Sequence, residues 1–274
     1  MSFNQEVNRV LSQQYQWMSG YFSKEQKVSL LTDTYFAGGL FTSLISKERV
    51  KDYDLFCSTT GTAALLFKVF KYSCGYANQL ELEFEVDEKN PNLYRGKLVS
   101  NHDRYSVDQL ISLVNEDAKA RKGDLAFLSK NALSLRNGIQ IIFRFVGPPN
   151  QVFTTFDYEH CKVAWEPSPL GLSLGLTKFY GKSLESLAKA ELVYSGNTRF
   201  VLSALSRLNK FIRRGWGIAP SSLLALALTA SKVDWNNKTA LEEELLGIYG
   251  IDPQVLTEIL KLSQVGEQLD LDKV

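Results

Sequence analysis

Cysteine and histidine are scarce in this chain, and neither is spaced as a metal or disulfide site would need. The 274 residues include three cysteines (Cys57, Cys74 and Cys161) and two histidines. No two cysteines form a C-x-x-C pair, and zinc sites need clustered thiolate and imidazole ligands. The pattern therefore argues against structural zinc and against a disulfide framework, and it is typical of buried thiols in a reducing cytosol.

A one-sided charge and a long hydrophobic run are also missing. The formal net charge is +1, so no overall field would attract nucleic acid or a membrane surface. No apolar run reaches the length of a membrane span, and the N-terminal residues lack the apolar core of a signal peptide. We therefore expect a cytoplasmic protein without a membrane partner. The most apolar stretch, residues 221–230, predicts a buried helix.

The hydrophobic residues that are present are enough for a large core and fall into two kinds of pattern. They make up 45% of the chain, and aromatic residues make up 12%. Strand and helix patterns are mixed in the first part, whereas only helix patterns follow from about residue 180. We predict an α+β fold: a mixed sheet with flanking helices over residues 1–172, then an all-helical domain over residues 173–274. The main predicted strands are 31–37, 53–57, 79–86, 138–146 and 151–165.

Two carboxylates interrupt an apolar strand in the stretch YFAGGLFTSLISKERVKDYDLFCS, residues 35–58. Side chains alternate between the faces of a strand, so Asp52 and Asp54 share one face, about 7 Å apart. Two such carboxylates repel each other unless a cation lies between them. Mg²⁺ or Mn²⁺ suits this position, because Mg²⁺ prefers one or two carboxylates together with phosphate oxygens and water. The alternative is an edge strand with two solvated aspartates.

A glycine pair, Gly38–Gly39, precedes the two aspartates. Glycine lets the backbone approach a ligand closely, and the N-terminus of the short helix that follows would suit a triphosphate. The pair and Ser43 are therefore predicted to bind the phosphates of a nucleoside triphosphate (NTP), although an ordinary turn is the alternative.

A third carboxylate would complete a two-metal site. Asp157 interrupts the predicted strand 151–165, and burying it would be costly without a cationic partner. It is our choice for the third metal ligand, and Glu159, two residues on, is the alternative. His160 points to the opposite face of this predicted strand, and we interpret it as a structural, hydrogen-bonded histidine.

The glycine pair, the D-x-D strand and the later acidic residue together resemble the DNA polymerase β-like nucleotidyltransferase superfamily. The segments GIQIIFRFVGPPNQVFTTFDYEHCKVAW and SALSRLNKFIRRGWGI resemble uncharacterised nucleotidyltransferase-like proteins of bacteriophages. The resemblance covers residues 35–250 and implies a polymerase β-like palm, in the host cytoplasm if the chain is phage-encoded. The CCA-adding enzymes of this superfamily place an arginine and an aspartate just after the glycines, and GGLFTSLISKE has neither, which puts tRNA CCA addition in doubt.

A basic segment is the second feature of interest. Residues 195–216 hold five cations and no acidic residue. In a helix over 201–214, Val201, Leu205, Leu208 and Ile212 would form one face, and Arg207, Lys210 and Arg214 the opposite one. The cations are predicted to contact phosphates of the NTP or of an RNA or tRNA acceptor bound along 199–214. The alternative is a solvated helix face.

The sequence thus predicts a metal-dependent nucleotidyltransferase that transfers a nucleoside monophosphate (NMP) from an NTP to a hydroxyl acceptor. RNA or tRNA is the first choice of acceptor, and a protein modified by a toxin or host-takeover factor is the second. A catalytically inactive nucleotidyltransferase fold that serves as a binding module is the third alternative. The oligomeric state is left open.

Overall fold

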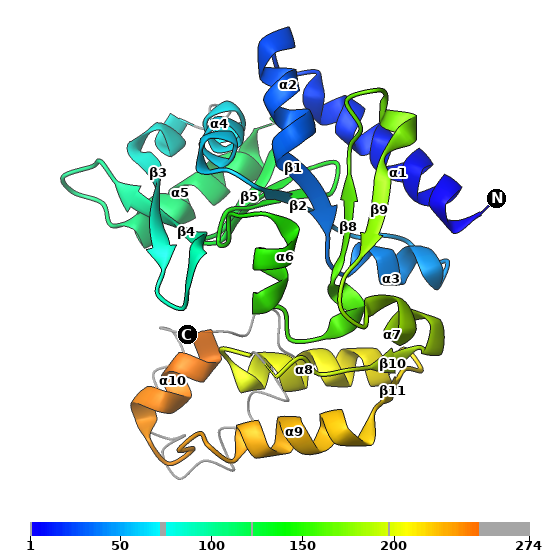
Figure 1. The fold of residues 1–274 in the computed structure, drawn as a ribbon. Coiled ribbons are helices and arrows are strands. Elements are labelled where there is room, and N and C mark those ends of the chain that lie inside the picture. The colour runs from blue at the N-terminus through cyan, green and yellow to red at the C-terminus, as the bar shows by residue number, and fades with distance from the viewer. Residues whose placement is uncertain (1, 72–74, 122, 197, 247–274) are drawn as a thin grey trace. The chain divides into compact units, whose positions relative to one another are not determined.

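The chain folds into two compact units, each described here by itself. The computed structural model describes residues 2–71, 75–121, 123–196 and 198–246 (Figure 1). The first unit comprises Met1–Thr154 and Cys161–Tyr180, and the second comprises Thr155–His160 and Gly181–Val274. The predicted boundary after residue 172 therefore lies within the first unit. Residues 247–274, the last part of the predicted all-helical domain, lie outside the described residues.

The first unit contains a mixed sheet, a separate two-stranded ribbon and short and long helices. Its α-helices are α1 (Phe3–Ser19), α2 (Lys24–Asp33), α3 (Leu40–Ile45), α4 (Thr60–Lys71), α5 (Val107–Ala120) and α6 (Pro149–Val152). Its strands are β1 (Thr34–Ala37), β2 (Tyr53–Cys57), β3 (Leu80–Asp87), β4 (Asn90–Ser100), β5 (Leu125–Leu128), β6 (Ala132–Leu135), β7 (Ile139–Ile142), β8 (Val163–Glu166) and β9 (Leu176–Phe179). Its short 3₁₀ turns are η1 (Gly75–Gln79), η2 (Phe153–Thr155) and η4 (Leu172–Leu174), whereas most of η3 (Glu159–Cys161) belongs to the second unit.

Seven of these strands form one sheet in the order β5-β6-β7-β2-β1-β8-β9. The β2–β7 pair is parallel and the other neighbouring pairs are antiparallel. The prediction of a mixed sheet with flanking helices is thereby confirmed. The predicted strands do not include β4, β5, β6 or β9.

Helix α1 packs on one face of this sheet, and the apolar side chains on that face are buried. Phe36, Leu55 and Trp165 lie on this face and are completely buried. The Trp165 indole N–H donates to Asn8 Oδ1 of α1 at 2.6 Å, and its ring meets Tyr15 of α1 edge-on. This packing fixes which residues of each strand face the opposite side.

The β3–β4 ribbon is hydrogen-bonded through β4 to the segment that follows β7. Gly96 donates its N–H to the Phe143 carbonyl at 2.8 Å, and Tyr94 exchanges backbone hydrogen bonds with Val146. A Cβ on Gly96 would lie 2.3 Å from the Phe143 oxygen, so this close contact needs glycine.

The second unit is mainly helical. Its elements are α7 (Ser183–Lys189), β10 (Glu191–Leu192), α8 (Val201–Ile212), β11 (Gly217–Ile218), α9 (Pro220–Ala230) and α10 (Lys238–Leu246). Strands β10 and β11 pair in parallel, so the prediction of an all-helical C-terminal part is not confirmed. The prediction is also wrong for residues 176–179, which form β9 at the edge of the first unit's sheet.

The strand predicted at 151–165 is wrong over most of its length. Residues 149–155 are helical (α6 and η2), a second 3₁₀ turn follows at 159–161, and only 163–166 form a strand. Pro148 and Pro149 explain the difference, because proline at the start of a helix has the backbone angle that a first helical turn requires.

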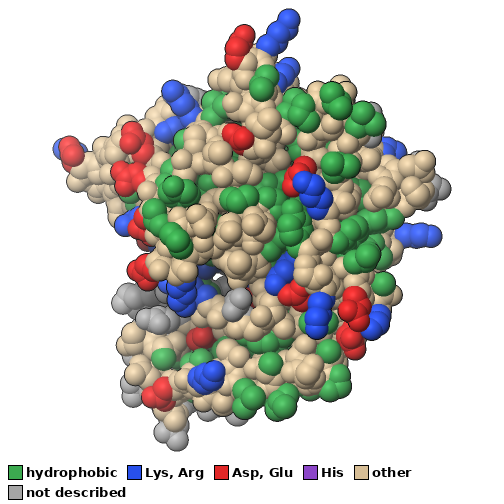
Figure 2. All heavy atoms as spheres, in the orientation of Figure 1, with side chains coloured by type: hydrophobic (Ala, Val, Ile, Leu, Met, Phe, Trp, Pro, Cys, Tyr) green, Lys and Arg blue, Asp and Glu red, His purple; other side chains and the backbone are tan. Residues whose placement is uncertain are grey.

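Helix α9 is less buried than its apolar sequence predicted. Only Ser222 and Leu226 are buried, whereas Leu223, Leu224 and Leu228 are 49%, 62% and 56% exposed. Figure 2 shows hydrophobic side chains at the surface over this helix. A helix that is apolar on all sides has no hydrophobic periodicity. The sequence therefore did not indicate which side of α9 is buried and which is exposed.

Two further expectations bear on compartment and membrane contact. Cys57 is buried, as expected, whereas Cys161 is partly exposed and Cys74 lies outside the described residues. Within the described ranges, no helix is both long enough and apolar enough to cross a membrane.

Candidate functional site

The two predicted metal ligands lie at the start of β2. Asp52 immediately precedes the strand and is exposed, and Asp54 is its second residue and is half-buried. Asp54 pairs directly with Ala37, the last residue of β1. Gly38 follows Ala37 with a φ of 88°, a conformation that favours glycine. A Cβ on Gly38 would lie 3.0 Å from Asp54 Oδ2, so the structure brings this predicted glycine and this predicted carboxylate into contact.

Gly39 and Ser43 have different local roles from Gly38. Gly39 is the N-terminal cap of the six-residue helix α3, has helical backbone angles and would tolerate a Cβ, since no atom lies within 4 Å of that position. Ser43 is half-buried within α3, and its N–H points to the Gly39 carbonyl at 3.4 Å. Of the two glycines, only Gly38 has a backbone conformation that favours glycine.

A row of small and polar side chains flanks Asp54 across the sheet. The residues level with Asp54 on its two neighbouring strands are Ala37 of β1 and Gln140 of β7. Gln140 is in turn level with Ser134 of β6, to whose Oγ its Nε2 donates at 3.0 Å. Neither β1 (TYFA) nor β7 (IQII) contains an acidic residue. Our sequence reasoning missed Gln140, although a single polar residue among isoleucines was a visible signal.

Asp157, the predicted third metal ligand, belongs to the second unit and is 6% exposed. Its carboxylate forms an ion pair with the Arg207 guanidinium of α8. Its carbonyl accepts from the Ser195 N–H at 2.8 Å. The cationic partner that burial demands is therefore present as a protein side chain. The assignment of Asp157 to a metal stays a prediction.

Glu159, the alternative third ligand, is also buried within the second unit. Its Oε2 accepts from the Lys182 backbone N–H at 2.8 Å, and its own N–H donates to the Val193 carbonyl. Gly181 has a φ of 55° and leaves room for this carboxylate, because a Cβ there would lie 2.3 Å from Glu159 Oε2. Glu159 thus joins the start of α7 to the segment before it.

His160 lies in an aromatic cluster of the second unit. Its ring contacts the rings of Phe211 and Trp216, with centroids 4.3 and 5.0 Å away. Burial, followed by the positive charges of Arg214 and Arg207, lowers the pKa of His160 to about 3. A neutral imidazole buried among aromatic rings agrees with the structural role that we expected for it, and its hydrogen bonding stays a prediction.

The basic residues of α8 do not form the simple face that we predicted. The buried residues of the helix include Val201, Ala204, Leu208 and Phe211, whereas Leu205 is only half-buried and Ile212 is 48% exposed. The buried face of the helix includes Phe211 in place of Ile212, because the Phe211 ring packs on His160. Of the predicted phosphate contacts, Arg207 pairs with Asp157, Lys210 is exposed and Arg214 lies over the Phe211 ring at 5.1 Å.

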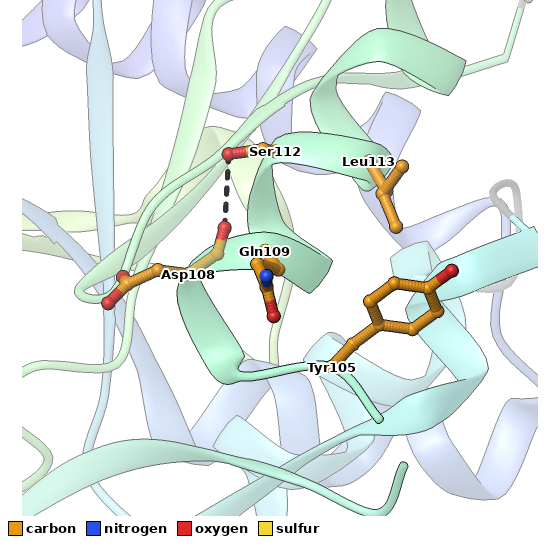
Figure 3. Close-up of a pocket in the computed structure, with 5 residues that line it drawn as sticks. All are labelled: Tyr105, Asp108, Gln109, Ser112 and Leu113. Carbon is orange, nitrogen blue, oxygen red and sulfur yellow. Dashed lines mark hydrogen bonds between the residues drawn. The ribbon is translucent and has the colours of Figure 1, made fainter. Parts of the chain in front are cut away.

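Neither a cluster of metal-binding side chains nor a hollow marks a different site within the described residues. No group of three or more acidic, histidine or cysteine side chains within these residues could hold a metal ion. A hollow of about 380 Å³ beside α5 is lined by Tyr105, Asp108, Gln109, Ser112 and Leu113 (Figure 3). It contains none of the predicted site residues, and Asp108 there pairs with Lys130 at 2.7 Å. The contact between Gly38 and Asp54 makes the start of β2 the candidate site.

A family model for Gabija anti-defense 2 proteins matches residues 9–172, which include Gly38, Asp54 and Gln140. The chain belongs to this family. The curated protein Gabija anti-defense 2 of Bacillus phage SPbetaL7 is 21% identical over 242 residues, which cover 88% of this chain. The chain spans about half the length of this relative, since the match covers 48% of it. The expected likeness to a bacteriophage protein is thereby confirmed.

Solved structures of CCA-adding enzymes are also similar. The Thermotoga maritima enzyme in complex with tRNA is 12% identical, with a TM-score of 0.44, over 90% of this chain and 54% of that one. The Bacillus stearothermophilus enzyme in complex with CTP is 14% identical, with a TM-score of 0.41, over 89% of this chain and 52% of that one. TM-scores this low do not establish a common fold.

Replacing Gly38 by alanine should damage the site, whereas the same change at Gly39 should not. Alanine at the positive φ of Gly38 costs about 1–2 kcal/mol, and its Cβ would press on Asp54 Oδ2. Gly39→Ala is the matched control, because its backbone is helical and its Cβ position is open. Denaturant unfolding measures the stability of both variants. Equal stability would contradict the requirement for glycine at position 38.

Removing the guanidinium from Arg207 should destabilise the second unit. Arg207→Gln leaves the buried Asp157 carboxylate without its ionic partner, and we expect a loss of about 1–3 kcal/mol in the free energy of unfolding. Lys210→Gln on the same helix makes the same charge change at an exposed position and should have little effect. If the two variants unfold alike, the Arg207–Asp157 pair is not stabilising.

His160 should make stability depend on pH. Its folded-state pKa of about 3 lies below its ordinary value of 6.5, so between these values the unfolded chain binds more protons. Stability should therefore fall as the pH drops below 6.5, by up to about 1.4 kcal/mol per pH unit. Unfolding at pH 7 and pH 5 measures the slope, which should be shallower in His160→Gln than in the parent chain; an equal slope in the two proteins would contradict this role of His160.

Proposed function

We propose that this chain binds an NTP and a divalent cation at the start of β2 and transfers an NMP to a hydroxyl acceptor. We further propose that this transfer serves phage counter-defence against Gabija, the activity that names the family. The observation that carries the proposal is the contact of Asp54 with Gly38, beside Asp52, at one end of the sheet. The same arrangement of a glycine and a D-x-D pair supports the resemblance to nucleotidyltransferases.

The residues present suit one Mg²⁺ or Mn²⁺ ion. Asp52 is exposed and Asp54 is half-buried, so their carboxylates would hold a hydrated cation that also accepts phosphate oxygens. When bound, the cation neutralises charge on the phosphates and on the departing pyrophosphate. Gly38 leaves room for the phosphates beside Asp54, because it carries no side chain there. Gly39 and Ser43 remain proposed phosphate contacts.

The proposed transfer displaces pyrophosphate. The acceptor oxygen forms a bond to the α-phosphorus, the bond between the α-phosphorus and the bridging oxygen breaks, and the hydroxyl proton passes to solvent. The chain's own contribution is to hold the NTP in line with the acceptor. Lys210 and Arg214 of the second unit are proposed to contact phosphates of a nucleotide or of an RNA or tRNA acceptor. Arg207 and Asp157 pair with each other in the second unit, and their phosphate and metal roles stay predictions.

A second candidate function is supported by Gln140 and Ala37. Both are uncharged, and both are level with Asp54 on the strands where a third carboxylate would complete a two-metal site. On this ground the chain could instead be a nucleotide-binding module that acts in counter-defence without transfer. Binding and transfer therefore have to be measured separately.

Each α-³²P-labelled NTP should be incubated with the protein, Mg²⁺ or Mn²⁺, and RNA and protein from Bacillus cells that carry Gabija. We expect a metal-dependent label that the Asp52→Asn/Asp54→Asn double variant loses. Asp103→Asn/Asp108→Asn makes the same charge change at two exposed aspartates away from the proposed site and should retain the label. Digestion with nuclease or protease then distinguishes an RNA acceptor from a protein acceptor.

Calorimetry and infection assays complete this test. NTP binding without label, lost in the same double variant, would favour the binding module. If the protein shows no label and binds no NTP, the proposed site is refuted. Counter-defence is measured by plaque formation of a Gabija-restricted phage on cells that express either double variant, and only the Asp52/Asp54 variant should fail to protect the phage.

A further inference from the structure

Gln140 places a polar amide on the half-buried face of β7, the face that it shares with Asp54. It is the one polar residue of β7, between Ile139 and Ile141, which are both fully buried. Strands favour β-branched residues, and a half-buried amide must be hydrogen-bonded or solvated. Ser134 satisfies only one part of this amide, the Nε2 donor.

The hydrogen bond to Ser134 orients the Gln140 amide. Strand β7 lies between β6, which carries Ser134, and β2, which carries Asp54. The Nε2 atom is engaged on the β6 side at 3.0 Å. The Oε1 atom is the other end of the same planar group, so it is not the atom that Ser134 engages, and it remains an acceptor on the sheet face that Gln140 shares with Asp54.

The register places this amide beside the carboxylate. Gln140 and Asp54 are level in the parallel pair of β7 and β2, so their side chains project from the same face of the sheet. Neighbouring strands lie about 4.8 Å apart. An amide oxygen and a carboxylate oxygen at that separation can share one cation, because each metal–oxygen bond is about 2.0–2.6 Å long.

The other flank of Asp54 offers no ligand. Ala37 and, beyond it, Ala164 of β8 are level with Asp54 and carry only methyl groups. These small residues leave the sheet face open beside the carboxylate. Any further side-chain ligand from a strand level with Asp54 must therefore come from β7.

We infer that Gln140 is a metal ligand of the candidate site through Oε1, and that Ser134 is the residue that orients it. The site then consists of two carboxylates and one neutral amide oxygen and suits a single hard cation. This inference rests on the proposed binding of a cation by Asp52 and Asp54. It assigns the third ligand within the first unit and leaves the Asp157–Arg207 pair intact.

Mn²⁺ binding tests the inference without any measurement of transfer. The full chain is added to Mn²⁺, and the loss of the free Mn²⁺ signal in electron paramagnetic resonance measures binding. The titration is done once without nucleotide and once with α,β-methylene-ATP. Gln140→Leu removes the amide oxygen and should weaken Mn²⁺ binding by about tenfold or more. Gln140→Glu supplies a charged oxygen at the same place and should bind Mn²⁺ more tightly than the parent chain. Ser134→Ala should weaken binding by less than Gln140→Leu.

The outcomes separate this inference from the proposed function. If Asp52→Asn/Asp54→Asn abolishes Mn²⁺ binding while Gln140→Leu and Gln140→Glu bind as the parent does, Gln140 is not a ligand and the proposed site stands. If the double aspartate variant still binds Mn²⁺, the proposed site itself is wrong. Should Gln140→Leu fail to fold, Gln140→Met decides, because its side chain has about the same length as glutamine but carries no oxygen, and parent-like binding would then overturn the inference.

Discussion

The pairing of Ala37 with Asp54 is the constraint on which the candidate site depends. It places the positive-φ backbone of Gly38 against the Asp54 carboxylate. A slip of one residue between the strands would turn Asp54 toward the face that α1 covers, where Phe36 and Trp165 are completely buried. The cost of burying a carboxylate there makes the register secure. The core on one side of the sheet therefore determines which residues meet on the other.

The same rule about buried charge explains the second unit, where protein partners satisfy the carboxylates. We inferred from the sequence that Asp157 needed a cationic partner, and the requirement is correct. The partner in the structure is the Arg207 guanidinium, supplied by a helix that is 50 residues away in the chain. Glu159 meets the same need with the Lys182 backbone N–H. A buried acidic residue thus predicts a positive or hydrogen-bonding partner without specifying whether that partner is a metal.

How much of this structure the sequence could predict depends on whether the signal was local. The strand YDLFC and the glycine turn before it follow from alternation and backbone preference, and the structure reproduces both. The strand at 151–165 failed where Pro148 and Pro149 set a helical turn. The neighbour of Asp54 could not be predicted, because it depends on the parallel pairing of β2 with β7, strands 80 or more residues apart in sequence. That pairing is decided by packing and not by either strand alone.

Charge balance links the ligand set to the chemistry that the site could support. Two carboxylates carry two negative charges, which one divalent cation neutralises, whereas a second cation would need a further carboxylate to offset its charge. A neutral amide at Gln140 adds an oxygen ligand and no charge. A one-cation site can hold the triphosphate and favour departure of pyrophosphate, but it does little to lower the pKa of an acceptor hydroxyl. Transfer at such a site would then favour an acceptor that is already acidic or is activated by its own surroundings. This requirement makes the identity of the acceptor, more than that of the nucleotide, the property that would separate this chain from a nucleotidyltransferase with three acidic metal ligands.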